Sequence, residues 1–349
     1  MIFSRQVIVL PLLFIASITS AAHAAAARAK PTRPVVDDKD AFKGAIVVDA
    51  ASGHVLFERN ADLVSPPASM TKLMTFAVLH DKLAANALSL TTPVTVNRAE
   101  AIFAMKSDST SVWLKEKETF PVEELIYAMM IQSANDASLV LARAAAGSSE
   151  AFVELMNAKA HELGMTHTSF HTPHGLTKGK VNPAVTDLTT PRDFALLSRH
   201  LLLHTDVLKY TAVKTRSFGT GQRSKLVEMT NHNHLLGRAA GVDGLKTGYT
   251  AGAGFCLAAT ALRNGHRVIV VTMDGNTYQA RDLKVIELLE RGFSALPPGS
   301  PAFEASGATV ATSAADTMPS PLTLAPLSSA EKPADASDST IKFSIPKKK

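Results

Sequence analysis

The order of strand-like and helix-like segments constrains the fold of this chain more than any other feature. Two apolar runs with strand composition, at residues 41–50 and 54–58, flank Ser52-Gly53 and predict a β-hairpin. Helical spacing of apolar residues dominates the middle of the chain, and strand patterns return only after residue 210. We therefore predict an α+β fold in which both ends of the chain build one antiparallel sheet, flanked by helices, with a helical lobe inserted.

The individual elements follow from periodicity and from proline positions. The expected helices span residues 70–83, 122–131, 136–145, 151–163, 192–203 and 281–294. The expected later strands span residues 211–218, 225–230, 241–249, 254–262 and 267–273. Pro66, Pro67 and Pro191 stand just before two of these helices, where proline is tolerated. A functional site is expected in the cleft between the sheet and the helical lobe.

Both ends of the chain differ in composition from the part between them. Arg5, an apolar run over residues 7–18 and Ala22-His23-Ala24 predict a signal peptide over residues 1–24. The run is too short to span a bilayer comfortably, so we expect cleavage and a soluble protein of the periplasm or cell envelope. A linker over 25–39, a folded domain over 40–296 and a disordered low-complexity tail over 297–349 complete the expected organisation.

Charge and rare residues exclude several classes of protein. Net charge is +5, but the basic residues are scattered among 31 acidic ones, so nucleic-acid binding is not expected. Only Lys347, Lys348 and Lys349 form a basic run, which predicts a solubilising end or a weak contact with an anionic wall or membrane surface. The single cysteine, Cys256, excludes an internal disulfide and is expected to be buried. The single tryptophan, Trp113, is expected in the core or on a cleft wall.

Ser69-Met70-Thr71-Lys72 is the first candidate for catalysis. A serine in the first turn of a helix exposes its backbone N–H to a developing oxyanion, and a lysine three residues later lies on the same face. A desolvated lysine near other cations can act as a general base. The same spacing at Ser329 and Lys332 lies in the predicted tail. The helix start marked by proline therefore distinguishes Ser69 and Lys72.

Ser133-Ala134-Asn135 is the second candidate, in the short link between two expected helices. Residues at i and i+2 of an extended turn can direct a hydroxyl and an amide into one cavity. The alternative is that Ser133 or Asn135 simply caps the following helix.

Lys246-Thr247-Gly248 is the third candidate, inside an expected strand. Glycine weakens a strand unless another backbone must approach closely. Lys246 and Thr247 are then available for a substrate carboxylate, and the Tyr249 N–H completes an oxyanion hole with the N–H of Ser69. The alternative is an edge-strand lysine that protects against aggregation.

Taken in order, the three motifs resemble those of penicillin-binding proteins and serine β-lactamases. PASMTKLMT around Ser69, SANDAS around Ser133 and VDGLKTGYTAGAGFCLAATA around Lys246 are similar to the low-molecular-mass D-alanyl-D-alanine carboxypeptidases. The resemblance covers about residues 42–296. It implies a β-lactamase/transpeptidase-like fold for the domain at 40–296, inhibition by β-lactams and no cofactor or metal.

The resemblance also implies a role for each motif. Ser69 would attack the penultimate D-alanine of a peptidoglycan stem peptide, with Lys72 as its base. Ser133 would pass a proton to the leaving amine, and Asn135 would hold Lys72 and the peptide. The residues expected to bind the substrate are Lys246, Thr247, Gly248, Arg281 and His174. For Arg281 the alternative is a surface ion pair.

Two departures from the family pattern stand out in the sequence. Residues 297–349 lack the apolar period of the membrane-lying C-terminal helix that many relatives carry. His232 stands near a position where relatives often have arginine, so carboxylate binding is expected to rest on Arg281 and Lys246.

The sequence raises four alternative functions. A class A β-lactamase needs a glutamate that activates the deacylating water, and none occurs between Met165 and Arg192. A DD-endopeptidase would use the same residues on cross-links. A non-hydrolytic β-lactam sensor or wall scaffold would acylate without turnover. A metal enzyme would draw on the clustered histidines, but no acidic or cysteine partner stands at ligand spacing; these histidines are His167, His171, His174, His232 and His234.

Overall fold

The structure is a computed structural model that describes residues 41–106, 109–176 and 180–305. These residues belong to one unit, which spans Val36–Lys349. The predicted signal peptide over 1–24 and linker over 25–39 lie outside the described residues, as does the chain after residue 305. Within the described residues, no helix is both long enough and apolar enough to cross a membrane.

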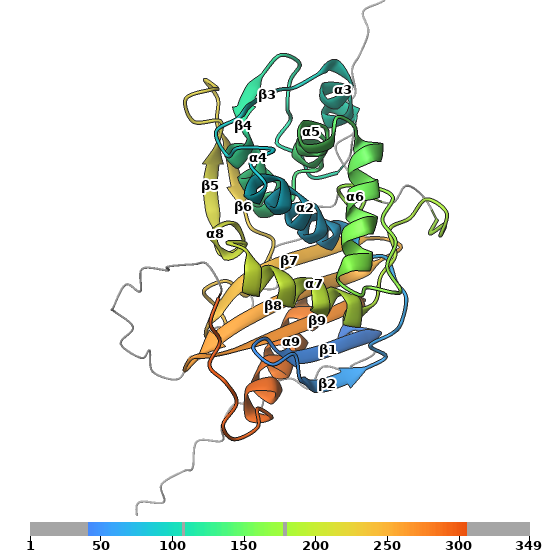
Figure 1. The fold of residues 1–349 in the computed structure, drawn as a ribbon, viewed down its shortest axis with the longest axis vertical. Helices are drawn as coiled ribbons and strands as arrows, with labels where there is room; N and C mark the ends of the chain where they lie inside the picture. Colours follow the sequence, from blue (N-terminus) through green and yellow to red (C-terminus); the bar gives the residue numbers. More distant parts are fainter. Residues whose placement is uncertain (1–40, 107–108, 177–179, 306–349) are drawn as a thin grey trace, which may run out of the picture. The chain divides into compact units, whose positions relative to one another are not determined.

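Both ends of the described chain build a five-stranded antiparallel sheet in the order β2-β1-β9-β8-β7 (Figure 1). The N-terminal hairpin supplies β1 (Gly44–Asp49) and β2 (Val55–Arg59). The later strands are β7 (Val242–Thr250), β8 (Gly254–Arg263) and β9 (His266–Gly275). Because β9 pairs with β1, the sheet joins segments from the two ends of the sequence. The predicted α+β architecture is confirmed.

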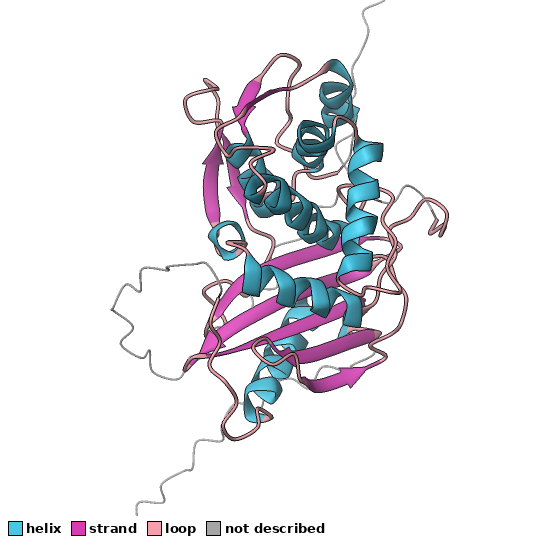
Figure 2. Cartoon of the chain, in the orientation of Figure 1, coloured by secondary structure: helices cyan, strands magenta, loops and turns pink. Residues whose placement is uncertain are grey.

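Alternating side chains bury the two faces of this sheet under different helices. Val47, Val268 and Val270 belong to the apolar cluster that contains α9 (Tyr278–Ser294). Their neighbours Ile46 and Ile269 belong to the cluster that contains α7 (Pro191–His204). The period of two in a strand therefore places α7 and α9 on opposite faces (Figures 1 and 2).

The inserted lobe is mainly helical (Figure 2). Its helices are η1 (Ala68–Thr71), α2 (Lys72–Ala84), α3 (Arg98–Lys106), α4 (Val122–Ile131), α5 (Asn135–Ala146), α6 (Ser149–Glu162) and α8 (Leu208–Thr211). Two small two-stranded antiparallel sheets, β3 (Pro93–Thr95) with β4 (Thr119–Pro121) and β5 (Thr215–Phe218) with β6 (Val227–Thr230), complete it.

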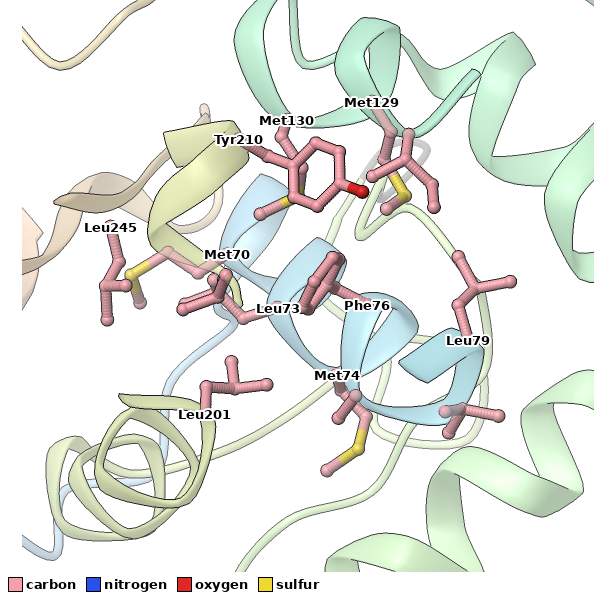
Figure 3. Close-up of a cluster of buried hydrophobic side chains, with 14 of the residues drawn as sticks. Met70, Leu73, Met74, Phe76, Leu79, Met129, Met130, Leu201, Tyr210 and Leu245 are labelled. Carbon is pink, nitrogen blue, oxygen red and sulfur yellow. The ribbon is translucent and has the colours of Figure 1, made fainter. Parts of the chain in front are cut away.

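Helix α2 lies at the centre of the core, and the 3₁₀ turn η1 that leads into it carries the candidate nucleophile. Phe76 packs against Tyr210 of α8, with ring centroids 5.4 Å apart. Leu73 and Met74 are fully buried, and side chains from α4, α7 and β7 surround the helix (Figure 3). A helix that is apolar on most sides is held rigidly by its neighbours, which fixes the position of its first turn.

Three expectations about elements need correction. The strand expected over 211–218 begins only at Thr215, because residues 208–211 form a helical turn that places Tyr210 against Phe76. Helix α3 and the short strands β3 and β4 were not expected from the sequence. The tail was expected to begin at 297, but residues 297–305 are described and Phe303 N donates to Gly265 O at 2.8 Å.

Candidate active site

Ser69 and Lys72 lie one turn apart where η1 passes into α2. Ser69 stands within the 3₁₀ turn and Lys72 is the first residue of α2. Lys72 Nζ lies 3.0 Å from Ser69 Oγ. The contact expected from the three-residue spacing is therefore present.

Lys72 is fully buried and has three polar neighbours. Besides Ser69 Oγ, its Nζ contacts Asn135 Oδ1 at 2.6 Å and the backbone oxygen of His174 at 2.8 Å. Burial, followed by the nearby charge of Lys246, lowers the pKa of Lys72 well below its ordinary value. The amine can therefore be neutral under conditions in which an exposed lysine is charged.

Ser133 lies in the link between α4 and α5, as expected, and Asn135 is the first residue of α5. Neither side chain caps α5, whose N-cap is Ala134. Asn135 instead joins Lys72 to Ser109, to which its Nδ2 donates at 2.8 Å. Ser133 has φ of +62°, and its buried Oγ has no hydrogen-bond partner among the described residues. A strained serine with an unpaired hydroxyl is costly unless the site uses it.

Strand β7 runs beside the nucleophile turn because Gly248 has no side chain. A Cβ at Gly248 would lie 2.4 Å from Pro67 O and 3.2 Å from the backbone nitrogen of Ser69. Only glycine permits this approach, which brings the backbone at Gly248 and Tyr249 close to that of Ser69. The sequence predicted that another backbone, such as that of an extended peptide, approaches Gly248; in the structure the approaching backbone is that of Pro67 and Ser69.

Lys246 lies buried in the same strand and shares its surroundings with Arg281 and His232. Burial and then the charge of Arg281 lower the pKa of Lys246 to about 7. Burial and then the charge of Lys246 lower the pKa of His232 to about 3. Thr247, next to Lys246, is also buried. The site therefore concentrates positive charge, which suits an anionic ligand group.

Arg281 is buried and already partnered, so it is not the surface ion pair considered as an alternative. Its Nε and one Nη donate to Asp282 Oδ1 at 2.9 and 2.7 Å. The other Nη donates to Cys256 O at 3.2 Å. The charge of Arg281 acts on the site by lowering the pKa of Lys246.

The segment after α6 contributes a backbone oxygen and an acidic anchor that sequence reasoning missed. His174 contacts Lys72 through its carbonyl, while its ring stacks on Phe103 with centroids 5.6 Å apart. Asp187 is buried and accepts from Thr71 Oγ1 at 2.8 Å and from the N–H of His171 at 2.7 Å. Asp187 therefore ties this segment to the turn that holds Ser69. Neither contribution belongs to a recognisable motif.

Asp136 is a second missed residue, although it follows Asn135 directly. It is fully buried and accepts from Ser111 Oγ at 2.5 Å and from the N–H of Leu114 at 3.0 Å. It thereby fixes the segment at 109–114 beside the site. Among the described residues, no group of three or more His, Cys, Asp and Glu side chains is placed to hold a metal ion.

With this geometry established, the chain can be compared with known proteins. Residues 12–277 match the family model described as D-alanyl-D-alanine carboxypeptidase. The carboxypeptidase DacC of Escherichia coli is 39% identical over 71% of this chain and 60% of its own length. A D-alanyl-D-alanine endopeptidase of Pseudomonas aeruginosa is 32% identical over 74% of this chain and 81% of its own length.

Solved structures agree with the sequence comparison. Penicillin-binding protein D2 of Listeria monocytogenes, in its ampicillin-bound form, superposes with a TM-score of 0.63 at 33% identity. The superposition covers 72% of this chain and 97% of that structure. The predicted transpeptidase-like fold is therefore confirmed. The chain spans less than two thirds of the length of DacC and of its Bacillus subtilis relative DacF, of which it covers 60% and 62%.

The family match extends over all three motifs, from before Ser69 to beyond Lys246. The chain therefore belongs to the D-alanyl-D-alanine carboxypeptidase family.

Proposed function

We propose that this protein is a serine-type D-alanyl-D-alanine carboxypeptidase that removes the terminal D-alanine from peptidoglycan stem peptides. The observation that carries the proposal is the set of contacts around Lys72 Nζ. A neutral amine has two N–H groups and one lone pair. If the two N–H groups donate to Asn135 Oδ1 and His174 O, the lone pair faces Ser69 Oγ and can accept its proton.

Acylation follows from this arrangement. Lys72 takes the proton as Ser69 Oγ bonds to the penultimate D-alanine carbonyl, and the N–H groups of Ser69 and Tyr249 bind the oxyanion. The C–N bond then breaks, and Ser133 passes a proton from Lys72 to the leaving amine of D-alanine. Water hydrolyses the resulting ester and regenerates the Ser69 hydroxyl.

Binding of the substrate carboxylate falls to the cationic side of the cleft. Lys246 and Thr247 contact the terminal carboxylate, and Arg281 strengthens the positive potential there, with or without a direct contact. His174, which was expected to bind the substrate, contributes through its backbone carbonyl, which accepts a hydrogen bond from Lys72 and so holds the amine in the site. A β-lactam carries a carboxylate next to a reactive amide, so it fits the same groups and acylates Ser69.

Mass spectrometry of the intact protein tests the nucleophile. Incubation with penicillin is expected to add one penicilloyl group that maps to Ser69 and is absent in Ser69→Ala. Ser329→Ala is the matched control, because it removes the serine of another Ser-x-x-Lys sequence and should leave the adduct intact. An adduct on any other residue would overturn the assignment of Ser69.

Turnover separates the enzyme from a sensor or scaffold. The wild-type protein should release many equivalents of D-alanine from a peptide that ends in D-Ala-D-Ala. Acylation by penicillin without any release of D-alanine would support a non-hydrolytic role.

A second candidate is a DD-endopeptidase that cuts cross-links between stem peptides. It is favoured by the endopeptidase of Pseudomonas aeruginosa, of which this chain covers 81%. Digestion of purified cross-linked muropeptide dimers distinguishes the two, because an endopeptidase yields monomers without free D-alanine.

The proposed substrate places the protein in the bacterial cell envelope, where it would trim peptidoglycan during wall synthesis and influence cell shape. The signal sequence expected over residues 1–24 supports export to the periplasm. Fractionation of cells that express the full chain, with N-terminal sequencing of the mature protein, tests both the location and the cleavage after residue 24.

A further inference from the structure

Trp113 is exposed beside the site, so of the two positions expected from the sequence, core or cleft wall, it does not occupy the core. Its side chain is 57% exposed, and it is the only tryptophan in the chain. Its φ is +52°, a conformation that large side chains rarely adopt. A large exposed aromatic ring in a strained backbone has no packing reason, which indicates a binding role.

The backbone around Trp113 is held from both sides. Its N–H donates to Ser111 Oγ at 3.1 Å, and Ser111 in turn donates to Asp136. An Nη of Arg223 donates to Trp113 O at 3.0 Å. These bonds fix the backbone from which the ring projects before any ligand arrives, which reduces the entropic cost of binding.

Trp113 borders a pocket of about 600 Å³ between the segment at 113–118 and the β5–β6 hairpin. Its other lining residues are polar apart from Leu226 and Val227. Arg223 and Glu118, which also line it, pair with each other. Lys115 and Lys225 belong to no ion pair among the described residues and outnumber the one other lining carboxylate, Glu228. One aromatic face with several polar groups and two available cations suits an amphipathic, acidic ligand.

The pocket connects structurally to the site through the segment at 109–113. Asn135, which contacts Lys72, donates to this segment through its N–H to Thr110 O at 3.0 Å and through Nδ2 to Ser109 Oγ at 2.8 Å. Trp113 follows Ser109 by four residues, so the two lie at most about 14 Å apart. An extended peptide of five residues is about 17 Å long, which covers this separation.

We propose that this pocket binds a sugar ring of the glycan strand that carries the stem peptide. The pyranose stacks on the Trp113 indole, and Lys115 and Lys225 attract acid groups of the attached peptide. This inference rests on the proposed function, because it concerns the glycan end of the same substrate. It assigns the enzyme a preference for glycan-linked peptides over free ones.

Fluorescence tests sugar binding without using catalysis. Because Trp113 is the only tryptophan, its emission reports on this pocket directly. Titration of the full chain with the disaccharide of N-acetylglucosamine and N-acetylmuramic acid should change this emission saturably, and Ser69→Ala should respond like the wild type. An unchanged emission at millimolar disaccharide would overturn the proposal.

Kinetics test whether the pocket serves the substrate. For a disaccharide-linked pentapeptide, Trp113→Ala should raise KM about tenfold, whereas KM for the free pentapeptide should change less than about twofold. Trp113→Phe keeps an aromatic face and should restore most of the loss. Leu196→Ala, which truncates an exposed apolar residue of α7, is the matched control and should behave like the wild type.

The outcomes separate this inference from the proposed function. If Trp113→Ala changed KM equally for both peptides, or for neither, the proposed sugar pocket would be contradicted. The proposed carboxypeptidase function would be unaffected by that result. If the wild type released no D-alanine but Trp113 still responded saturably to the disaccharide, the proposed function would fail and the sugar pocket would stand.

Discussion

At the scale of single residues, the site needs two lysines in opposite protonation states. Lys72 must be neutral to accept a proton, whereas Lys246 must be charged to bind a carboxylate. Both are buried and near other cations, and burial is the main cause of both lowered pKa values. Activity therefore depends on a pH range in which Lys72 has lost its proton and Lys246 has kept its own.

The alkaline limit of this range is the first prediction. Lys246 loses its charge as the pH rises through its pKa of about 7, so kcat/KM for a peptide with a free carboxylate should fall above that pH. Lys246→Arg keeps the charge at every accessible pH and should move this limb upward, even if its maximal rate is lower. Identical alkaline limbs in the pH profiles of both proteins would show that Lys246 does not set the limit.

Asp187 provides a second prediction at this scale. Asp187→Ala leaves the buried hydroxyl of Thr71 and the N–H groups of His171 and Thr172 without their acceptor. We expect a loss of about 2–4 kcal/mol in the free energy of unfolding, together with slower penicillin acylation. Urea denaturation and the acylation rate measure the two effects.

Asp62→Ala is the control for Asp187, because Asp62 is 58% exposed in its ion pair with Arg192. Its removal should cost no more than about 1 kcal/mol and leave acylation unchanged. Equal losses in the two variants would contradict an anchoring role for Asp187.

At the scale of elements, the close approach of β7 to η1 determines whether the backbone N–H groups of Ser69 and Tyr249 lie near enough to bind one oxyanion. Gly248→Ala would place a Cβ 2.4 Å from Pro67 O, so one of the two elements must shift. A displacement of this size at a catalytic centre costs about a hundredfold in rate. We expect a fall of this order in the rate of acylation by penicillin, measured by intact mass.

Gly147→Ala is the matched control for this prediction. Gly147 ends α5 with φ of +83°, and a Cβ there would meet no atom within 4 Å. The substitution should therefore lower stability by about 1–2 kcal/mol without slowing acylation. If both variants acylated at the wild-type rate, close contact between β7 and η1 would not be required.

The elements also show what could be predicted from sequence. Helix α4 was predicted at both ends from the helical spacing of its apolar residues, and the hairpin of β1 and β2 followed from Ser52-Gly53. Helix α3 was missed because its sequence, RAEAIFAMK, has a weak apolar period and no cap that stood out. The turn at Tyr210 was missed because a tertiary contact with Phe76 outweighs the strand-like composition that follows it.

The same limit applies to the site. Ser69, Lys72, Asn135 and Gly248 were identified because spacing and residue type carry the information. The carbonyl of His174 and the acceptor Asp187 could not be found this way, because any residue supplies a carbonyl and the partners of Asp187 are up to 116 positions away. Trp113 was uncertain in the sequence, since an aromatic residue suits a core and a surface equally.

At the scale of the whole molecule, residues that follow α9 pack back against the five-stranded sheet. Phe303 N donates to Gly265 O, in the turn between β8 and β9, and the Arg267 guanidinium lies 5.1 Å from the Phe303 ring centroid. Arg267 also pairs with Asp243 at the start of β7 at 2.7 Å. The residues after α9 therefore support the end of the sheet that is remote from Lys246.

The final prediction separates stability from catalysis on this basis. Phe303→Ala removes a partly buried ring and its contact with Arg267, so it should lower the free energy of unfolding by about 1–2 kcal/mol in urea. Phe303→Leu keeps apolar area without the cation–π contact and should lose less. Penicillin acylation should not change in either variant, because Lys246 pairs with Ala258, about 23 Å along the strand from Gly265. Slower acylation at unchanged stability would mean that the C-terminal segment acts on the site instead of supporting the sheet.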